Sequence, residues 1–275
     1  MKCFASPTVG LNFGFNYFNL PSMNLTDRHQ HILSRLKKEG SVNVIDLCNE
    51  LEVSSVTIRK DLKMLEDRNL LFRTHGGGTL VNPYTTDRPV TEKAMIRSGE
   101  KLGIGEAAAK LIESNDCILI ASGTTVLSLA KNIQPHGQLT VVTAALNVAM
   151  ELVHHPGVEV IQLPGIIRKT SSSVTGNFAE EMLGSFSFSK LFLGVDGIDP
   201  EFGLTTTNMM EAQLNKRMIA ASQKTIVLAD SSKFGKRGFG RICGLEDIEQ
   251  IITDNNISDH MAETLKGMGI EVTIV

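Results

Sequence analysis

The first third of this chain contains the stretch VSSVTIRKDLKMLEDRNLLFRTHGGG, from Val53 to Gly78. Ser54 is a favourable helix N-cap, and three apolar residues after it recur at helical spacing: Ile58, Leu62 and Leu65. The opposite face of the same helix carries Ser55, Thr57, Arg59, Lys60 and Lys63. The stretch therefore predicts a helix that buries one face and presents hydroxyl and basic groups on the other.

Two helix patterns precede this stretch and a hairpin pattern ends it. The first helix is predicted from Thr26, taken as its N-cap, to a stop at Gly40, and a short second helix follows Asn43. Residues 70–75 alternate like a strand, a glycine run follows at 76–78, and a second short strand is predicted from Thr79. Residues 24–81 are thus predicted to form a winged helix-turn-helix domain.

In such a domain the third helix enters the DNA major groove, where Arg59 is long enough to contact a guanine. The candidate DNA-binding residues are Ser54, Ser55, Thr57, Arg59, Lys60, Lys63, Arg73 and His75. The alternative is a packing module with solvated lysines, because residues 24–82 carry nine basic against eight acidic residues, a net charge of +1. Pattern alone leaves both interpretations open.

The string from Val53 to Gly78 closely resembles the DNA-binding signature of the deoxyribose-operon repressor (DeoR) family of bacterial regulators. The resemblance extends over residues 25 to 80 and includes the hydroxyl-rich helix start, the IRKDL core and the His-Gly-Gly wing. It implies a double-stranded DNA operator as partner. One departure is Gly78, where the family often has alanine, and we expect it to alter only the flexibility of the wing.

Two segments lie outside the predicted domains. Residues 1–23 are rich in Phe and Tyr but lack the continuous apolar run of a signal peptide, so they are interpreted either as a start-site extension before Met23 or as an ordered arm. Residues 82–92 contain Pro83 and Pro89 with few apolar side chains, which predicts a linker.

Residues 93–275 alternate short apolar runs with helical patterns. Strands are predicted at 117–120, 139–142, 158–161, 191–194, 225–228, 251–252 and 272–275, and helices at 100–113, 124–131, 146–154, 208–221 and 258–267. Near-continuous apolar strands indicate burial on both faces, so we expect an open, mostly parallel α/β sheet. Ligands bind such sheets outside the carboxyl ends of the strands.

Polar residues follow several of these predicted strands. Ser122, Gly123, Thr124 and Thr125 come before a helix, where hydroxyls and free backbone N–H groups form a phosphate cradle. The alternative is a routine turn in which the hydroxyls only cap the helix. Asp196, Glu211 and Lys233 come after other strands, and they offer carboxylates for sugar hydroxyls and an ammonium for phosphate.

The strings SGTT, VDGID, GLTT and DSSKFG match the effector-sensing domain of the same DeoR family, whose fold is similar to ribose-5-phosphate isomerase. This resemblance implies that Ser122 to Thr125 hold a phosphate, that Asp196 and Glu211 lie near a sugar, and that Lys233 closes the site. The segment Leu163-Pro164-Gly165 departs from the Gly-Gly pair common in relatives, which puts effector contacts there in doubt.

Composition bears on the partner, the compartment and the presence of a metal site. The net charge of −3 gives no support to DNA binding by itself, no run of 18 apolar residues suggests a membrane span, and the four scattered cysteines fit the cytoplasm and not a zinc site. The function expected is a cytoplasmic repressor of a carbohydrate operon, released by a sugar phosphate, without cofactor or metal and at least dimeric. The alternative is a sugar-phosphate isomerase with an accessory DNA-binding domain, because Asp196, Glu211 and Lys233 suit proton transfer.

Overall fold

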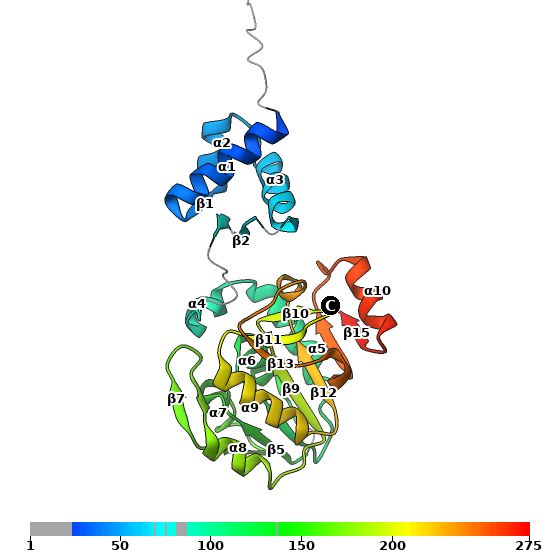
Figure 1. The fold of residues 1–275 in the computed structure, drawn as a ribbon. Coiled ribbons are helices and arrows are strands. Elements are labelled where there is room, and N and C mark those ends of the chain that lie inside the picture. Colours follow the sequence, from blue (N-terminus) through cyan, green and yellow to red (C-terminus); the bar gives the residue numbers. More distant parts are fainter. Residues whose placement is uncertain (1–23, 69, 75, 81–86, 136) are drawn as a thin grey trace, which may run out of the picture. The chain divides into compact units, whose positions relative to one another are not determined.

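The computed structural model describes residues 24–68, 70–74, 76–80, 87–135 and 137–275. The chain divides into two compact units, Met1–Pro83 and Tyr84–Val275, drawn in Figure 1. The expectations for residues 1–23 and for His75 lie outside the described residues.

The first unit is built from short helices around a small sheet. Its elements are α1 (Leu25–Glu39), β1 (Ser41–Asn43), α2 (Val44–Leu51), α3 (Ser55–Asp67), β2 (Phe72–Thr74) and β3 (Gly77–Thr79). Three strands pair in the order β1-β3-β2, all antiparallel. One apolar cluster joins all three helices through residues such as Ile32, Leu47 and Ile58. This arrangement is a winged helix-turn-helix.

Most of the predicted helix ends in this unit are confirmed. Asn43 caps α2, Ser54 caps α3, and Gly40 ends α1 with φ +76°. The predicted cap of the first helix was wrong: Asn24, not Thr26, accepts a hydrogen bond from the Asp27 N–H at 2.9 Å. Both residue types cap helices well, so the choice between them depended on where the chain turns.

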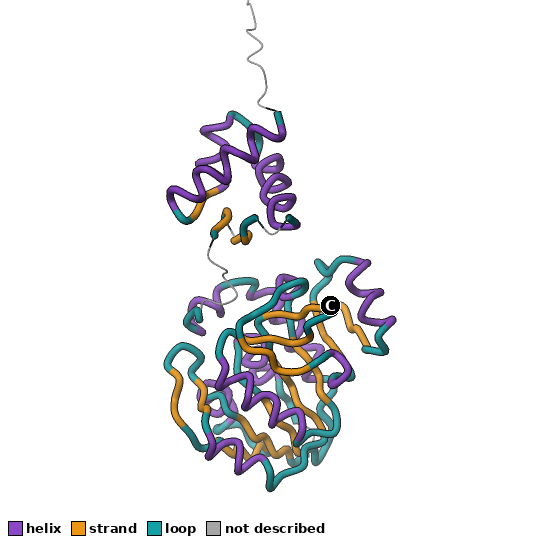
Figure 2. The backbone as a smooth tube through the Cα atoms, viewed as in Figure 1, coloured by secondary structure: helices purple, strands orange, loops and turns teal. Residues whose placement is uncertain are grey.

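The second unit is a parallel sheet between two layers of helices (Figure 2). The sheet strands are β4 (Cys117–Ile120), β5 (Leu139–Thr143), β6 (Val158–Gln162), β9 (Lys190–Gly194), β12 (Thr225–Leu228), β14 (Gln250–Thr253) and β15 (Glu271–Ile274). The order is β15-β14-β12-β9-β4-β5-β6, and every neighbouring pair is parallel. The predicted strands and the predicted sheet type are confirmed.

Alternate strand residues face opposite helix layers. Leu119 and Leu193 belong to the apolar cluster with α8, α9 and α10, whereas Ile118 and Phe192 belong to the cluster with α5, α6 and α7. The helices are α5 (Ser98–Ala109), α6 (Thr124–Asn132), α7 (Leu146–Leu152), α8 (Asn177–Leu183), α9 (Met209–Ala220) and α10 (Asp259–Gly267). Burial on both faces explains why the strands are apolar throughout.

Several smaller elements were not predicted from the sequence. They are β1 and α8, the helix α4 (Val90–Met95), the hairpin β7 (Ile166–Arg168) and β8 (Ser173–Thr175), the antiparallel sheet β10 (Gly197–Asp199), β11 (Gly203–Thr206) and β13 (Gly240–Cys243), and the short 3-10 helices η1 (Ser231–Lys233) and η2 (Leu245–Asp247). The described part of the expected linker also differs from expectation. Asp87 accepts hydrogen bonds from the side chains of Arg168 and Thr170, and the Val90 N–H donates to the Thr170 carbonyl oxygen.

Candidate functional site

The N-terminus of α3 is closed by its own hydroxyl groups. The backbone N–H of Thr57 donates to the Ser54 Oγ at 3.2 Å, and the two hydroxyl oxygens lie 3.0 Å apart. Ser55 is half-buried beside them. Ser54 and Thr57 therefore fix the start of the helix, and this N-cap holds the predicted DNA-reading residues in register.

The basic residues of α3 lie on its exposed face. Arg59, Lys60 and Lys63 are exposed, and within the described part of the chain none of them forms an ion pair within 4 Å. They follow Ile58, whose side chain is fully buried. The structure therefore brings these three predicted residues together on the outer face of one helix.

The acid in the same stretch has a different role. Asp61 is only 1% exposed and receives the guanidinium of Arg28, with Nε to Oδ2 at 2.5 Å. His29 Nε2 lies 3.3 Å from the other carboxylate oxygen. Hydrogen bonding to Asp61 raises the pKa of Arg28 above its ordinary value. This buried cluster ties α3 to α1 and leaves the outer face of α3 basic.

The wing is fixed to α3 through Arg73. Its backbone N–H donates to Glu66 Oε1 at 2.9 Å, and its guanidinium lies 4.0 Å from the other Glu66 oxygen. The side chain of Arg73 is 38% exposed, so it remains within reach of a phosphate. Gly77 of the wing approaches β1 so closely that a Cβ there would lie 1.7 Å from the Val42 carbonyl oxygen.

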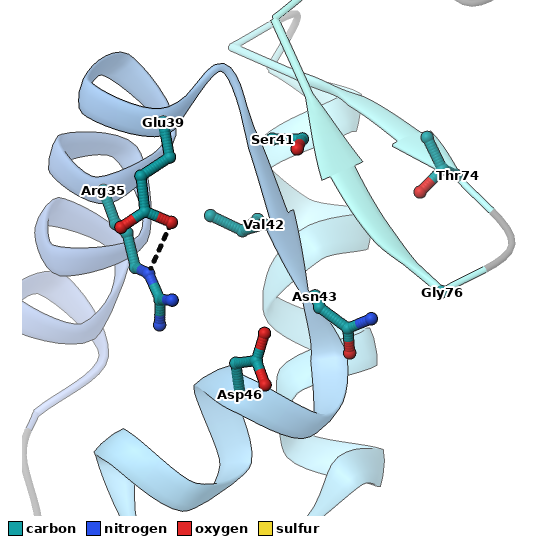
Figure 3. A pocket seen from close by; sticks show the side chains of 8 residues that line it. All are labelled: Arg35, Glu39, Ser41, Val42, Asn43, Asp46, Thr74 and Gly76. Carbon is teal, nitrogen blue, oxygen red and sulfur yellow. Dashed lines mark hydrogen bonds and ion pairs between the residues drawn. The ribbon is translucent and has the colours of Figure 1, made fainter.

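A hollow of about 470 Å³ lies beside the wing (Figure 3). It is lined by Arg35, Glu39, Ser41, Val42, Asn43, Asp46, Thr74 and Gly76. Arg35 is paired with Glu39 at 3.0 Å, which leaves the Asp46 carboxylate uncompensated within this lining. An acidic hollow repels phosphate, so it is a poor candidate for the effector.

In the second unit, the strand order reverses between β4 and β9. From β4 the successive strands β5 and β6 are added towards one edge of the sheet. From β9 the successive strands β12, β14 and β15 are added towards the other edge. The loops after β4 and β9 meet there, because a Cβ on Gly194 would lie 3.0 Å from the Ser122 carbonyl oxygen. Such a switch point is where open α/β sheets bind ligands. We call Ser122–Thr125, Asp196 and Asp230–Lys233 the carboxyl edge.

The N-terminus of α6 lies at this switch point without a side-chain cap. Its N-cap is Gly123, with φ +134°, and among the described residues no side chain makes a capping hydrogen bond there. Thr124 is the first helical residue and is half-buried, and Thr125 is buried. The alternative in which a hydroxyl of this turn only caps the helix is thus not observed. The first N–H groups of α6 stay available to an anion.

Asp196 and Glu211, predicted from separate motifs, are joined by one hydroxyl. The Thr206 Oγ1 lies 3.1 Å from Asp196 Oδ2 and 3.4 Å from Glu211 Oε2. Burial opposes ionisation of Asp196, but the charges of Lys93 and Lys233 outweigh it and hold the pKa of this carboxyl below its ordinary value. Asp196 is therefore a carboxylate at neutral pH, able to accept hydrogen bonds from hydroxyl groups.

Two cations that the sequence analysis missed bind these carboxylates. Lys93 Nζ donates to Asp196 Oδ1 at 2.9 Å, and Arg168 Nη1 lies 2.5 Å from Glu211 Oε1. Lys233, which was predicted, is half-buried and acts on Asp196 through its charge. Arg168 lies in a hairpin and Lys93 in a one-turn helix, and neither element has a clear sequence pattern.

Lys101 and Arg97 extend the basic group towards the loop after β12. Lys101 is 6% exposed, and burial lowers its pKa to about 8. Its ammonium donates to the carbonyl oxygens of Lys93 and Ile96, and Arg97 Nη1 donates to Ser231 Oγ at 3.0 Å. A lysine spaced i, i+3 and i+7 with Ile104 and Ala108 on a buried face was the available signal for Lys101.

Comparison with known proteins identifies both units. Residues 28–83 match the DeoR-like helix-turn-helix domain, and residues 96–255 match the DeoR C-terminal sensor domain. The chain belongs to the DeoR family of transcriptional regulators. This DeoR-family protein is 36% identical over 252 residues to a protein of Escherichia coli O157:H7 whose given name is that of an aga operon transcriptional repressor, covering 91% of this chain and 94% of that one.

Two relatives from Bacillus subtilis (strain 168) align with this chain along most of their length. The transcriptional regulator YulB is 34% identical, covering 92% of this chain and 98% of its own. The transcriptional repressor GlcR is 31% identical, covering 88% and 93%. The DeoR-family chain is thus a DNA-binding transcriptional regulator, not an enzyme, and the isomerase alternative falls away.

Solved structures with a similar fold include ribose-5-phosphate isomerase A from Methanocaldococcus jannaschii, with a TM-score of 0.36, 14% identity and coverage of 49% of this chain and 53% of that one. The sorbitol operon regulator SorC from Klebsiella pneumoniae has a TM-score of 0.33, 14% identity and coverage of 74% and 89%. Because both TM-scores are below 0.5, the assignment rests on the family and the curated relatives. None of the described helices is both long and apolar enough to cross a bilayer.

Proposed function

We propose that this regulator represses a carbohydrate-utilisation operon in the cytoplasm and leaves its operator when a phosphorylated sugar binds at the carboxyl edge. The names of the relatives support repression, since GlcR and the protein named for the aga operon are both called repressors.

The main support for this proposal is that a site for an anion and a set of hydrogen-bond acceptors lie together at the switch point. An uncapped helix N-terminus at Gly123 favours a phosphate, and the ionised Asp196 with Glu211 and Thr206 offers acceptors for sugar hydroxyls. Lys233 adds a cation without an ion pair within 4 Å among the described residues. Phosphate and polyol groups are thus expected to bind within one short stretch of sheet edge.

On the DNA side, we assign base contact to Arg59 and phosphate contact to Lys60, Lys63 and Arg73. The capped start of α3 at Ser54, Ser55 and Thr57 sets the depth of the helix in the groove, and His75 of the wing is assigned to the adjacent backbone. A helix-turn-helix reads two half-sites with twofold symmetry, so the protein is expected to bind its operator as a dimer or a larger homo-oligomer.

A ligand screen tests the effector assignment. The full chain is heated with ribose 5-phosphate, glucose 6-phosphate, fructose 6-phosphate and glycerol 3-phosphate, each alongside its unphosphorylated parent and inorganic phosphate. At about 100 times its dissociation constant, a bound effector stabilises the protein by roughly 2.7 kcal/mol. We expect at least one phosphate ester to raise the melting temperature more than its parent does. Equal effects of every ester and its parent would contradict the proposal.

A further inference from the structure

The segment that enters the second unit is bonded to two parts of the carboxyl edge, Asp196 and Ser231, and to the hairpin β7-β8. We call residues 87–101 the strap. Its hydrogen bonds reach Arg168 and Thr170 from Asp87, Asp196 from Lys93, and Ser231 from Arg97. The backbone N–H of Val90 also donates to the Thr170 carbonyl oxygen at 2.6 Å. The strap is therefore held in part by the loops that carry the proposed effector residues Asp196 and Lys233.

Asp87 is connected to both proposed sugar-binding carboxylates through one intermediate each. Arg168 donates from Nη2 to Asp87 Oδ2 at 2.6 Å while its Nη1 lies 2.5 Å from Glu211 Oε1. The Thr207 Oγ1 lies 3.4 Å from Asp87 Oδ1 and 3.4 Å from Asp196 Oδ2. Thr170 adds a hydroxyl 2.6 Å from Asp87 Oδ2. A change at either carboxylate thus alters a partner of Asp87.

A phosphorylated sugar at the carboxyl edge would compete with Asp87. The side chain of Arg168 is 12% exposed, so it has little access to water, and its donors serve Asp87, Glu211 and the hydroxyls of Thr170 and Ser171. A dianion near this guanidinium, or hydroxyl groups bound to Glu211, would draw those donors away from Asp87. The bond that would weaken is the one between Arg168 and Asp87, at the N-terminal end of the strap.

The position of Asp87 in the chain gives this competition a consequence. Asp87 lies four residues after Pro83, the last residue of the first compact unit. We propose that Asp87 is the coupling residue of this regulator: its bonds to Arg168, Thr170 and Thr207 hold the strap in the state that binds DNA, and effector binding releases it. The proposal rests on the effector assignment made above, but it can be tested without an effector.

The test uses the full-length protein, no sugar phosphate, and a DNA duplex selected from a random library by the wild-type chain. The variants are Asp87→Asn, which weakens the pairing with Arg168, and Thr170→Val, which removes one hydroxyl and leaves the charges intact. The control is Glu92→Gln, which removes an exposed charge from the same strap without breaking a hydrogen bond within the described residues. Duplex affinity and amide hydrogen exchange are measured on each protein.

We expect Asp87→Asn to speed amide exchange over residues 87–96 and to weaken duplex binding, each by about tenfold, as for the loss of one charge-assisted hydrogen bond. Thr170→Val should give a smaller change in the same direction, and Glu92→Gln should match the wild type. Faster exchange with unchanged duplex affinity would overturn the proposal, and so would unchanged exchange over residues 87–96. If Asp87→Asn does not fold, Thr170→Val decides by the same two criteria.

Because no sugar phosphate is present, this experiment fails independently of the effector screen. If Asp87→Asn binds the duplex like the wild type, the coupling proposal is wrong but a positive ligand screen still supports the effector site. If the ligand screen is negative, the effector site is wrong but the effect of Asp87→Asn on duplex affinity is unchanged.

Discussion

Arg28 of α1 binds Asp61 of α3 through two hydrogen bonds, from Nε to Oδ2 at 2.5 Å and from Nη2 to Oδ1 at 2.9 Å. Their side chains are 12% and 2% exposed. The pair fixes α3 to the first helix of the same unit, so Asp61 serves the position of α3.

Removing the charge of Asp61 should therefore lower stability before it affects DNA contact. Asp61→Asn leaves the Arg28 guanidinium with a poorer buried partner, and such losses cost about 3–5 kcal/mol. Urea unfolding of the first unit measures it, with the exposed Asp67→Asn as control. Equal unfolding midpoints for both variants would show that the pair contributes nothing to stability.

Two neighbouring glycines of the wing should respond in opposite ways to alanine. A Cβ at Gly77 would lie 1.7 Å from the Val42 carbonyl oxygen, whereas at Gly78 the nearest atoms are side-chain carbons of Leu62 and Leu71 at 3.4 Å. Gly77→Ala should destabilise the unit by about 1–3 kcal/mol or more. Gly78→Ala should be neutral or stabilising by up to about 1 kcal/mol. Thermal unfolding compares them, and equal losses would contradict the wing geometry.

The outer face of α3 predicts a distinction between its basic residues. Arg59→Ala should cost about 1–3 kcal/mol of operator affinity and relax sequence preference, as expected for a base contact. Lys63→Ala should weaken all duplexes alike and reduce the salt slope by about 0.9, as expected for one phosphate contact. Gel shifts across a salt series separate the two. A triple variant of Arg59, Lys60 and Lys63 that still binds like the wild type would refute the assignment of α3.

Lys101 makes the stability of the second unit depend on pH. Its pKa is about 8 in the folded protein, against an ordinary lysine pKa of 10.5 in the unfolded chain, so the unfolded chain binds more protons between these values. Stability from this group therefore rises with pH from about 8 to about 10.5. Lys101→Met lacks this gain, so the wild type should improve relative to the variant over that window. A difference in unfolding free energy that is constant from pH 7 to pH 10.5 would contradict the shifted pKa.

Much of the fold could be predicted because its signals are local. Each central strand, such as Thr225–Leu228, is apolar on both faces, and each cap of α2 and α3 is a residue that favours that position. The hairpin β7-β8 and helix α4 gave no such signal. In β7, the apolar side chains of Ile166 and Ile167 are exposed. The six-residue helix α4 has no buried residue. In both elements hydrophobicity therefore does not indicate burial.

The candidate site was predicted only where its residues follow strands. Asp196 and Ser122 come directly after apolar runs, so their position at one edge follows from the parallel sheet. Three other residues of the site bond to partners that lie 43 to 120 positions away in the sequence: Arg168, Lys93 and Asp87. No local sequence pattern encodes such contacts. Such contacts depend on the tertiary arrangement of loops.

Operator release, measured against sugar-phosphate concentration, shows whether phosphate is held at the start of α6. Thr124→Asp places a negative charge at the first residue of that helix, whereas Thr124→Asn is a control of similar size without the charge. Repulsion should abolish effector binding in Thr124→Asp while DNA binding persists, so this variant should stay on its operator at concentrations that release the wild type and Thr124→Asn. Equal release midpoints for the wild type and Thr124→Asp would contradict the account.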